Sequence, residues 1–234
     1  NTLRQRYAQF HFTDEYVGVL EQQAGFLYVE DCVRTHIEAA RFYGAEIHSD
    51  EAVCAWQANE AGVTVTTTQA TYHAAKLVVT AGPWAGQLLA RHGAVLRIMR
   101  QTLLWFSAED DRQFQRDRFP IYIAQVPEGQ FYGLPAIDAA GHKVARHYNA
   151  PELLAPAEIN RDALPEDETP VRAFLKEHLP QVNGPLRRAQ TCIYTLTPDR
   201  HFIIDLHPEH RNVALAAGFS GHGFKFASVV GEIL

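Results

Sequence analysis

The sequence predicts an α+β fold, in which helices accompany a large mixed or antiparallel sheet. Two observations predict this class. Residues 97–148 form a strand-rich stretch whose segments are separated by turn residues, as an antiparallel sheet requires. Residues 30–44 and 170–179 have the spacing of amphipathic helices. With 234 residues, of which 47% are hydrophobic and 21% charged, the chain can bury a full core without disulfides.

Charge and cysteine content narrow the classes of partner and compartment. Lys and Arg number 21 against 27 Asp and Glu, which disfavours nucleic acid and anionic membranes and favours a small-molecule substrate. No apolar run is long enough to span a bilayer, and the opening residues NTLRQRY lack an apolar signal region. Cys32, Cys54 and Cys192 form neither a CxxC pair nor a disulfide framework. We therefore expect a cytoplasmic protein.

The first third of the chain predicts a helix followed by a small meander. Val33, Ile37 and Ala40 recur at helical spacing within residues 30–44, and Gly44 ends the pattern. A turn at 59–62 then joins two segments of strand character into a hairpin. The strands predicted here are 46–48, 52–58 and 63–68.

A strand–turn–helix junction follows. Residues 76–80 read as a short apolar strand, 81–84 as a glycine turn and 85–91 as a helix. Free backbone N–H groups at such a junction can bind an anion, although an ordinary structural turn explains the pattern equally well.

The rest of the chain predicts mainly strands and two helices. A charged segment at 160–169 leads into the helix 170–179, which Pro180 ends. A glycine-rich turn leads into the last helix, 223–234. The predicted strands are 98–106, 121–126, 130–134, 143–147, 188–195, 202–205 and 213–217.

The glycine-rich turn is the first candidate site. Gly218, Gly221 and Gly223 lie between an apolar strand and a helix, where small residues let backbone amides approach a negatively charged ligand. A purely structural turn is the alternative. Lys225 lies at the predicted helix start, which is unfavourable for a cation unless an anion lies nearby. The alternative is a surface lysine whose aliphatic part packs on the protein while its ammonium stays in water.

Two strand residues are further candidates. Alternation places Lys143, Ala145 and His147 on one face, which makes either a positive pocket or an ordinary surface strand. Cys192 lies among β-branched residues and is either an inert buried thiol or a covalent attachment point. The histidines at 201, 207 and 210 match no metal-ligand spacing, so no metal site is predicted.

Five segments resemble the family of monomeric sarcosine oxidases and N-methyltryptophan oxidases, which are FAD-dependent amine oxidases. They occur in the family's order with similar spacing and cover nearly the whole chain from Gly18 onward. The segments are GVLEQQAGFLYVEDCVRTH at 18–36, KLVVTAGPWAGQLL at 76–89, FYGLPAIDAAGHKVARH at 131–147, CIYTLTPDRHFIIDLHPEH at 192–210 and GFSGHGFKFASVVGEI at 218–233.

The resemblance implies roles for individual residues. Lys143 matches the lysine over the flavin that activates oxygen, and Tyr132 and His147 match residues that shape the amine pocket. Cys192 matches the cysteine that tethers the flavin ring. The other residues implied in cofactor binding are Gly82, Trp84, Gly218, Gly221, His222 and Gly223. Those implied in substrate binding are Lys225 at the substrate carboxylate, Tyr194, and Ile123, which replaces a Met common in sarcosine-type members.

The resemblance also implies the chemistry. An N-methyl amino acid would be oxidised by FAD, the imine hydrolysed, and molecular oxygen reduced to hydrogen peroxide. A dehydrogenase with another electron acceptor and a catalytically inert binding module remain alternatives. The implied division is a substrate domain beginning at 1–75, FAD-domain elements at 76–95, a substrate-binding sheet and helix at 96–190, and an FAD-domain segment at 191–234.

One family motif is missing. The family begins with a βαβ unit bearing GxGxxG for the FAD pyrophosphate, and residues 1–18 show nothing like it. We therefore expect a fragment that lacks the N-terminal dinucleotide-binding unit, with partial Rossmann-like elements and without appreciable FAD affinity of its own.

Overall fold

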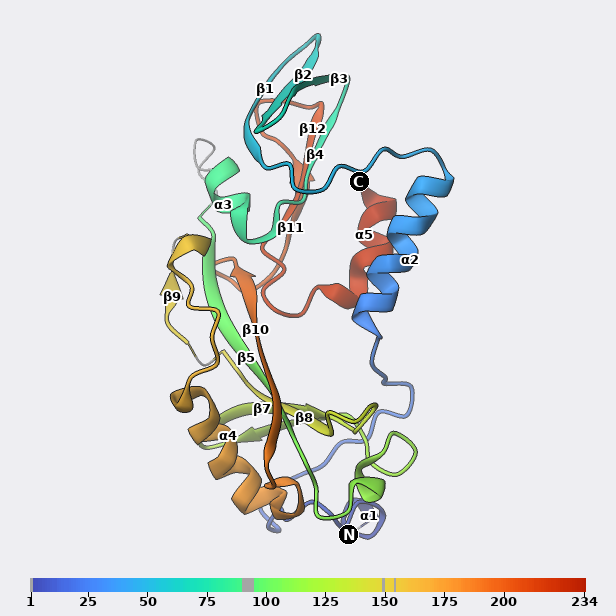
Figure 1. Ribbon diagram of the computed structural model, residues 1–234, viewed down its shortest axis with the longest axis vertical. Helices are drawn as coiled ribbons and strands as arrows, with labels where there is room; N and C mark the ends of the chain where they lie inside the picture. The colour runs from blue at the N-terminus through green and yellow to red at the C-terminus, as the bar shows by residue number, and fades with distance from the viewer. Residues whose placement is uncertain (1, 90–94, 149, 154) are drawn as a thin grey trace. The chain divides into compact units, whose positions relative to one another are not determined.

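The structure, a computed structural model, describes residues 2–89, 95–148, 150–153 and 155–234 (Figure 1). The predicted α+β class is confirmed. The chain divides into two compact units. The first unit comprises Asn1–Phe26, Arg100–Pro151 and Asn160–Cys192, and the second comprises Leu27–Met99, Glu152–Ile159 and Ile193–Leu234.

A largely antiparallel sheet organises the first unit. Its strands follow the order β10-β5-β8-β7-β6, and the pairs β5/β8, β8/β7 and β7/β6 are antiparallel. A short strand, β9, pairs with the beginning of β5. The bounds are β5 (Arg97–Phe106), β6 (Tyr122–Val126), β7 (Gly129–Leu134), β8 (His142–His147), β9 (Glu152–Leu153) and β10 (Leu186–Leu196).

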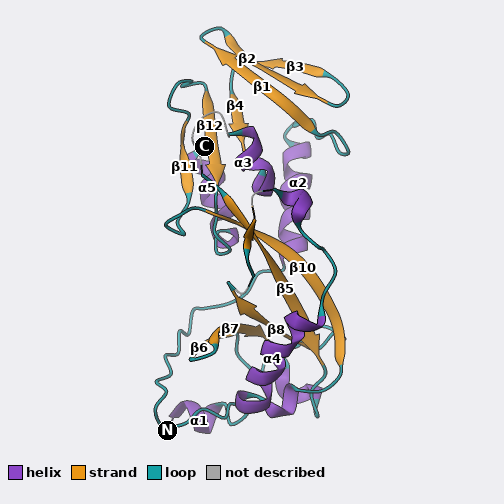
Figure 2. Cartoon of the chain, turned by 90° about the vertical axis from the view of Figure 1, so that its left-hand side faces the viewer, coloured by secondary structure: helices purple, strands orange, loops and turns teal. Residues whose placement is uncertain are grey.

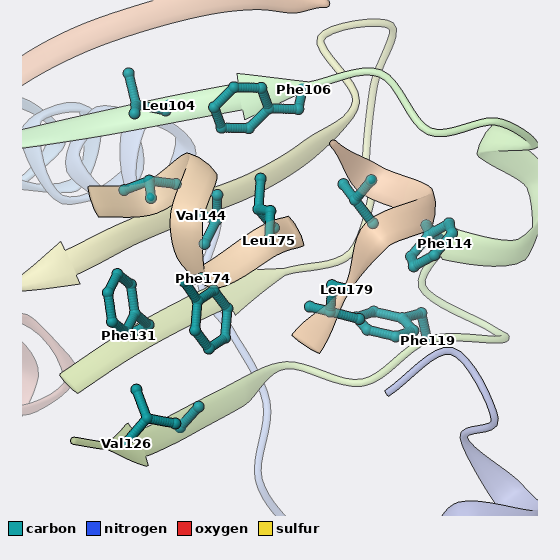
Figure 3. Packing of buried hydrophobic residues seen from close by; sticks show 13 residues of the cluster. Leu104, Phe106, Phe114, Phe119, Val126, Phe131, Val144, Phe174, Leu175 and Leu179 are labelled. Atoms are coloured by element: carbon teal, nitrogen blue, oxygen red, sulfur yellow. The ribbon is translucent and has the colours of Figure 1, made fainter. Parts of the chain in front are cut away.

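Helix α4 (Pro165–His178) covers one face of this sheet. Figure 3 shows Phe174 and Leu175 of α4 beside Phe131 of β7 and Val144 of β8. The Phe131 and Phe174 rings stack with centroids 4.4 Å apart. Each such buried side chain stabilises the fold by about 1.5 to 3 kcal/mol. Because successive strand residues point to opposite faces, the residues between these core positions point away from α4.

Helix α4 begins five residues earlier than predicted. Pro170 was expected to open the helix, whereas Pro165 does so and Pro170 lies inside it. The Asp167 carboxylate accepts a hydrogen bond from the Leu164 backbone N–H at 2.8 Å. This bond gives a partner to a backbone N–H at the start of the helix, where no helical carbonyl is available. Glu166, Asp167 and Glu168 of the predicted charged segment therefore lie in the first turn of the helix, where acidic side chains suit the helix dipole.

The second unit begins with the predicted helix, found as α2 (Val29–Phe42), and a meander that Figure 2 shows clearly. The meander strands are β1 (Val53–Asn59), β2 (Gly62–Thr67) and β3 (Thr71–Ala74). The Asn59 Oδ1 atom accepts from the N–H groups of Ala61 and Gly62 and closes the predicted hairpin turn.

One predicted strand in this region is wrong. Residues 46–48 lie in a loop, and β3, which was not predicted, is the strand that pairs with β2. His48 instead uses its ring, with Nδ1 3.2 Å from the Glu51 carboxylate. The segment is therefore held by this side-chain contact and not by hydrogen bonds to a neighbouring described strand.

A parallel pair of strands completes the second unit. Strand β12 (Val213–Ala217) pairs with β4 (Leu77–Val79) in parallel and with β11 (Ile203–Leu206) in antiparallel fashion. After β4 come a 3₁₀ turn at Gly82–Trp84 and α3 (Ala85–Leu88). The predicted end of that helix at 89–91 falls partly outside the described residues.

The predicted last helix is divided. A 3₁₀ turn, Phe224–Phe226, precedes α5 (Ala227–Ile233). A short helix, α1 (Thr2–Arg6), lies at the other end of the chain, in the first unit. None of the helices in the described part of the chain is long and apolar enough to cross a membrane.

Candidate functional site

The open face of the first unit's sheet, opposite α4, carries the candidate catalytic residues. Tyr132 of β7 lies opposite Ile123 on β6 and Ala145 on β8, so these residues share one face. Lys143 and His147 flank Ala145 at a spacing of two and therefore share it as well. The structure thus brings together three residues predicted as catalytic and one predicted to bind substrate.

Tyr132 and His147 are in ring contact on this face. Their rings meet edge to face with centroids 5.8 Å apart. The ring of Tyr148 also packs against His147, with the two centroids 3.9 Å apart. The contacts limit how the imidazole can turn, so His147 is presented in a defined orientation. Ile123, at 74% exposure, leaves the neighbouring position open to a ligand.

Lys143 lies over an indole ring. Its Nζ atom is 5.2 Å from the ring centroid of Trp105, its cross-strand partner on β5. Arg188 of β10 places its Cζ atom 4.7 Å from the same centroid. Two cations on one buried indole make this part of the face electropositive. Neither Trp105 nor Arg188 was identified from the sequence, because only the strand register brings them to Lys143.

Cys192 is a half-buried free thiol of β10. Burial raises the pKa of the Cys192 thiol, and the positive charge of Lys143 opposes this shift. Cys192 on β10 and Lys143 on β8 lie on the two strands that flank β5. Partial burial and a raised pKa agree with the alternative of an unreactive thiol, and the role of Cys192 as an attachment point stays a prediction. Cys32 and Cys54, both described, are also free.

The glycine-rich turn belongs to the second unit, where the structural alternative accounts for much of the pattern. Gly218 and Gly221 have positive φ values of 64° and 79°, which glycine adopts without strain. A Cβ atom on Gly221 would lie 2.5 Å from the ring of Tyr194, and one on Gly223 equally close to Phe219. These glycines therefore permit close packing within the chain itself.

Lys225 is exposed, as the surface-lysine alternative expects. The residue lies in the 3₁₀ turn before α5, and its Nζ atom donates to the His222 carbonyl oxygen at 3.0 Å. This bond agrees with the surface-lysine alternative, and contact with a substrate carboxylate stays a prediction. His222 is in turn held by its ring Nε2 atom, 2.9 Å from the Arg200 carbonyl oxygen.

The strand–turn–helix junction has an open surface. Gly82 has a φ of 52°, and no described atom lies within 4 Å of where its Cβ would stand. Trp84 is 50% exposed beside it. The positive φ explains the glycine without any packing constraint, and binding of a ligand by the backbone N–H groups of this junction stays a prediction.

The C-terminal histidines serve packing. The rings of His207 and His210 stack at 5.0 Å, and Trp56 meets His207 edge-on at 5.4 Å. Among the described residues, no group of three potential ligand side chains could hold a metal ion.

The sequence and fold together define the class of the protein. The profile of the FAD dependent oxidoreductase family matches residues 2–234, and the chain belongs to this family. The chain is 38% identical to monomeric sarcosine oxidase of Bacillus sp. (strain NS-129) over 236 residues, which cover 99% of this chain and 61% of that protein. N-methyl-L-tryptophan oxidase of Yersinia pestis (strain Pestoides F) is 37% identical over 235 residues, covering 99% and 62%. The resemblance found in the sequence is thereby confirmed.

Solved structures share the fold. NikD, an unusual amino acid oxidase essential for nikkomycin biosynthesis, superposes in its open form with a TM-score of 0.72 at 21% identity, covering 87% of this chain and 56% of that chain. L-proline dehydrogenase from P. horikoshii gives 0.73 at 20% identity, covering 87% and 53%. Of the curated relatives named above, the chain spans about three fifths of the length.

The residues present fit one end of FAD. The Cys192 thiol on β10 and the Lys143 ammonium on β8 offer a flavin ring a sulfur atom and a positive charge. The chain contains no GxGxxG sequence, so it offers no glycine-rich cradle of that type for the pyrophosphate.

Proposed function

We propose that the protein carrying this chain is an FAD-dependent oxidase of N-methyl amino acids such as sarcosine. The amine loses a hydride equivalent and becomes an imine, water hydrolyses the imine to an aldehyde and an amino acid, and oxygen is reduced to hydrogen peroxide. FAD, when bound, supplies the redox chemistry by accepting the hydride equivalent and returning the electrons to oxygen. The chain supplies binding, orientation and charge.

The placement of Lys143 and Cys192 on the two strands that flank β5, in a chain of the FAD dependent oxidoreductase family, carries this proposal. Cys192 is assigned as the tether of the flavin ring, and Lys143 as the fixed cation that stabilises negative charge developing on oxygen. Pre-positioned charge of this kind is commonly a large catalytic contribution. A flavin ring attached at Cys192 would lie on the same sheet as Lys143.

Tyr132 and His147 would shape the amine pocket, because their paired rings stand on the same face as Lys143. Ile123 would contact the substrate at the exposed edge of that face. Tyr194 and Lys225, from the second unit, are proposed to contact the substrate, the latter through its carboxylate. Gly82, Trp84 and the turn at 218–223 are proposed to contact FAD. Residues 76–95 and 191–234 would then belong to the FAD-binding domain. The parallel pairing of β4 with β12 supports this division, because it joins these two segments in one sheet.

A visible absorption spectrum of the full-length protein tests the proposal. A flavin spectrum that sarcosine or another N-methyl amino acid bleaches without oxygen, and that recovers with peroxide when air is admitted, supports it. Substoichiometric peroxide with full activity on an artificial acceptor would instead indicate a dehydrogenase. Precipitation with trichloroacetic acid should leave yellow flavin on the polypeptide, whereas a colourless pellet would contradict the tether at Cys192.

The role of Lys143 has its own test. Lys143→Met should slow reoxidation of the flavin by oxygen far more than its reduction by amine, because the ammonium acts on the oxygen step. Equal effects on the two half-reactions would remove this role.

A further inference from the structure

The indole of Trp105 is the structural partner of Lys143 on the open face. Strand register places the two residues directly opposite each other on β5 and β8. The Lys143 Nζ atom lies 5.2 Å from the ring centroid, within the range of a cation–π contact. The ring is 8% exposed, so it is held in place by its surroundings and can serve as a fixed surface for a flexible lysine.

We propose that Trp105 is a positioning residue that holds the Lys143 ammonium in place for the reaction with oxygen. This inference rests on the proposed function of Lys143. The lysine side chain has four rotatable bonds, and each unproductive rotamer removes the charge from the site. Tryptophan offers the strongest cation–π surface among the aromatic residues, so contact with its ring narrows the rotamers that the ammonium samples.

An indole has a specific advantage over a carboxylate as the support. A carboxylate would fix the ammonium but cancel its charge, and that charge is what stabilises reduced oxygen. The indole attracts the cation through its quadrupole and leaves the net charge unchanged.

Arg188 strengthens the arrangement. Its guanidinium lies 4.7 Å from the same ring centroid, and its Nη2 atom donates to the Gln190 Oε1 atom at 2.7 Å. The indole is therefore in contact with charged side chains from both neighbouring strands, β8 and β10. This second contact holds the ring and adds positive potential to the face.

Replacement of Trp105 in the full-length flavoprotein tests the inference. Trp105→Leu should slow flavin reoxidation about tenfold and leave reduction by amine within about twofold of the wild type. Trp105→Phe, which keeps an aromatic face, should recover most of the loss. In a Lys143→Met background, Trp105→Leu should cause no further slowing, because there is no ammonium left to position. Trp56→Leu, which removes an indole from the second unit, is the matched control and should not affect reoxidation.

A second measurement does not depend on turnover. A double-mutant cycle of Lys143→Met and Trp105→Leu, followed by denaturant unfolding, should show a coupling of about fivefold in the unfolding equilibrium constant. Absence of coupling, equal slowing of both half-reactions by Trp105→Leu, or a Trp105→Phe variant as slow as Trp105→Leu would overturn the inference. If Lys143→Met itself leaves reoxidation unchanged while the coupling is present, the proposed role of Lys143 fails and the Trp105 contact stands as structural only.

Discussion

The hydroxyl of Tyr122 lies 3.2 Å from the Nε2 atom of His142, and the two rings are parallel to within 5°. His142 is fully buried on the α4 side of the sheet, with Phe119 packed edge-on against it. Burial lowers the pKa of His142 to about 3 and raises the pKa of Tyr122 well above its usual range. Both side chains are therefore neutral across the physiological pH range, and the core contains a histidine that resists protonation.

The buried imidazole predicts loss of stability in mild acid. The unfolded chain protonates His142 near pH 6.5 and the folded chain only near pH 3, so the unfolded state binds more protons between these values. The free energy of unfolding should fall by about 1.4 kcal/mol for each pH unit below 6.5 from this residue alone. Urea unfolding at pH 6.5 and pH 4.5 measures the difference.

The matched control is His142→Leu, which cannot titrate. Carboxylates elsewhere contribute equally to both proteins, so the wild type should lose about 2 to 3 kcal/mol more than the variant between the two pH values. Parallel losses in both proteins would contradict a buried neutral histidine.

The ion pair between Arg100 and Asp167 predicts a large cost on disruption. Its two N–O contacts are 2.6 and 2.7 Å long, and the side chains are only 12% and 8% exposed. Asp167→Ala leaves a buried guanidinium without its carboxylate and removes the bond to the Leu164 N–H, so unfolding should become about 3 to 5 kcal/mol easier. Arg34→Ala breaks an exposed pair with Asp31 and should cost no more than about 0.5 kcal/mol. Chemical denaturation compares them; similar small losses would show that the buried pair is dispensable.

Two glycines of the second unit should respond oppositely to alanine. Gly221→Ala puts a Cβ at a φ of 79° and against the Tyr194 ring, so it should destabilise the protein by about 1 to 3 kcal/mol. Gly231→Ala lies within α5 where no described atom is within 4 Å of the new Cβ, and it should stabilise by about 0.5 to 1 kcal/mol. Differential scanning calorimetry gives both signs in one experiment. An unchanged melting temperature for Gly221→Ala would show that the Tyr194 ring moves freely.

The Cys192 thiol should react slowly, and more slowly still without Lys143. Burial raises the pKa of Cys192 and the lysine charge partly offsets it, so Lys143→Met should lower the thiolate fraction. In flavin-free protein near pH 8, iodoacetamide should label exposed Cys54 well before Cys192, and Lys143→Met should slow labelling at Cys192 only. Peptide mass spectrometry resolves the two sites. Identical labelling rates at Cys192 in both proteins would show that the Lys143 charge does not affect the thiol.

Local patterns were sufficient for most elements. The apolar spacing within residues 30–44 predicted α2, and the turn at 59–62 predicted the β1–β2 hairpin, because both depend on residues close in the chain. The prediction that α4 starts at Pro170 was wrong because Pro165 and Asp167 already form the first turn, and the helix continues through Pro170. The strand at 46–48 was wrong because alternation alone does not supply a partner strand.

By itself, the sequence determined the family, the α+β class and the face shared by Lys143 and His147, since a side-chain period of two is a local property of a strand. Only the tertiary structure decided that Trp105 lies under both Lys143 and Arg188. Those contacts join strands far apart in the chain. Their register is set by the packing of α4 against one face of the sheet, which determines which residues remain on the other.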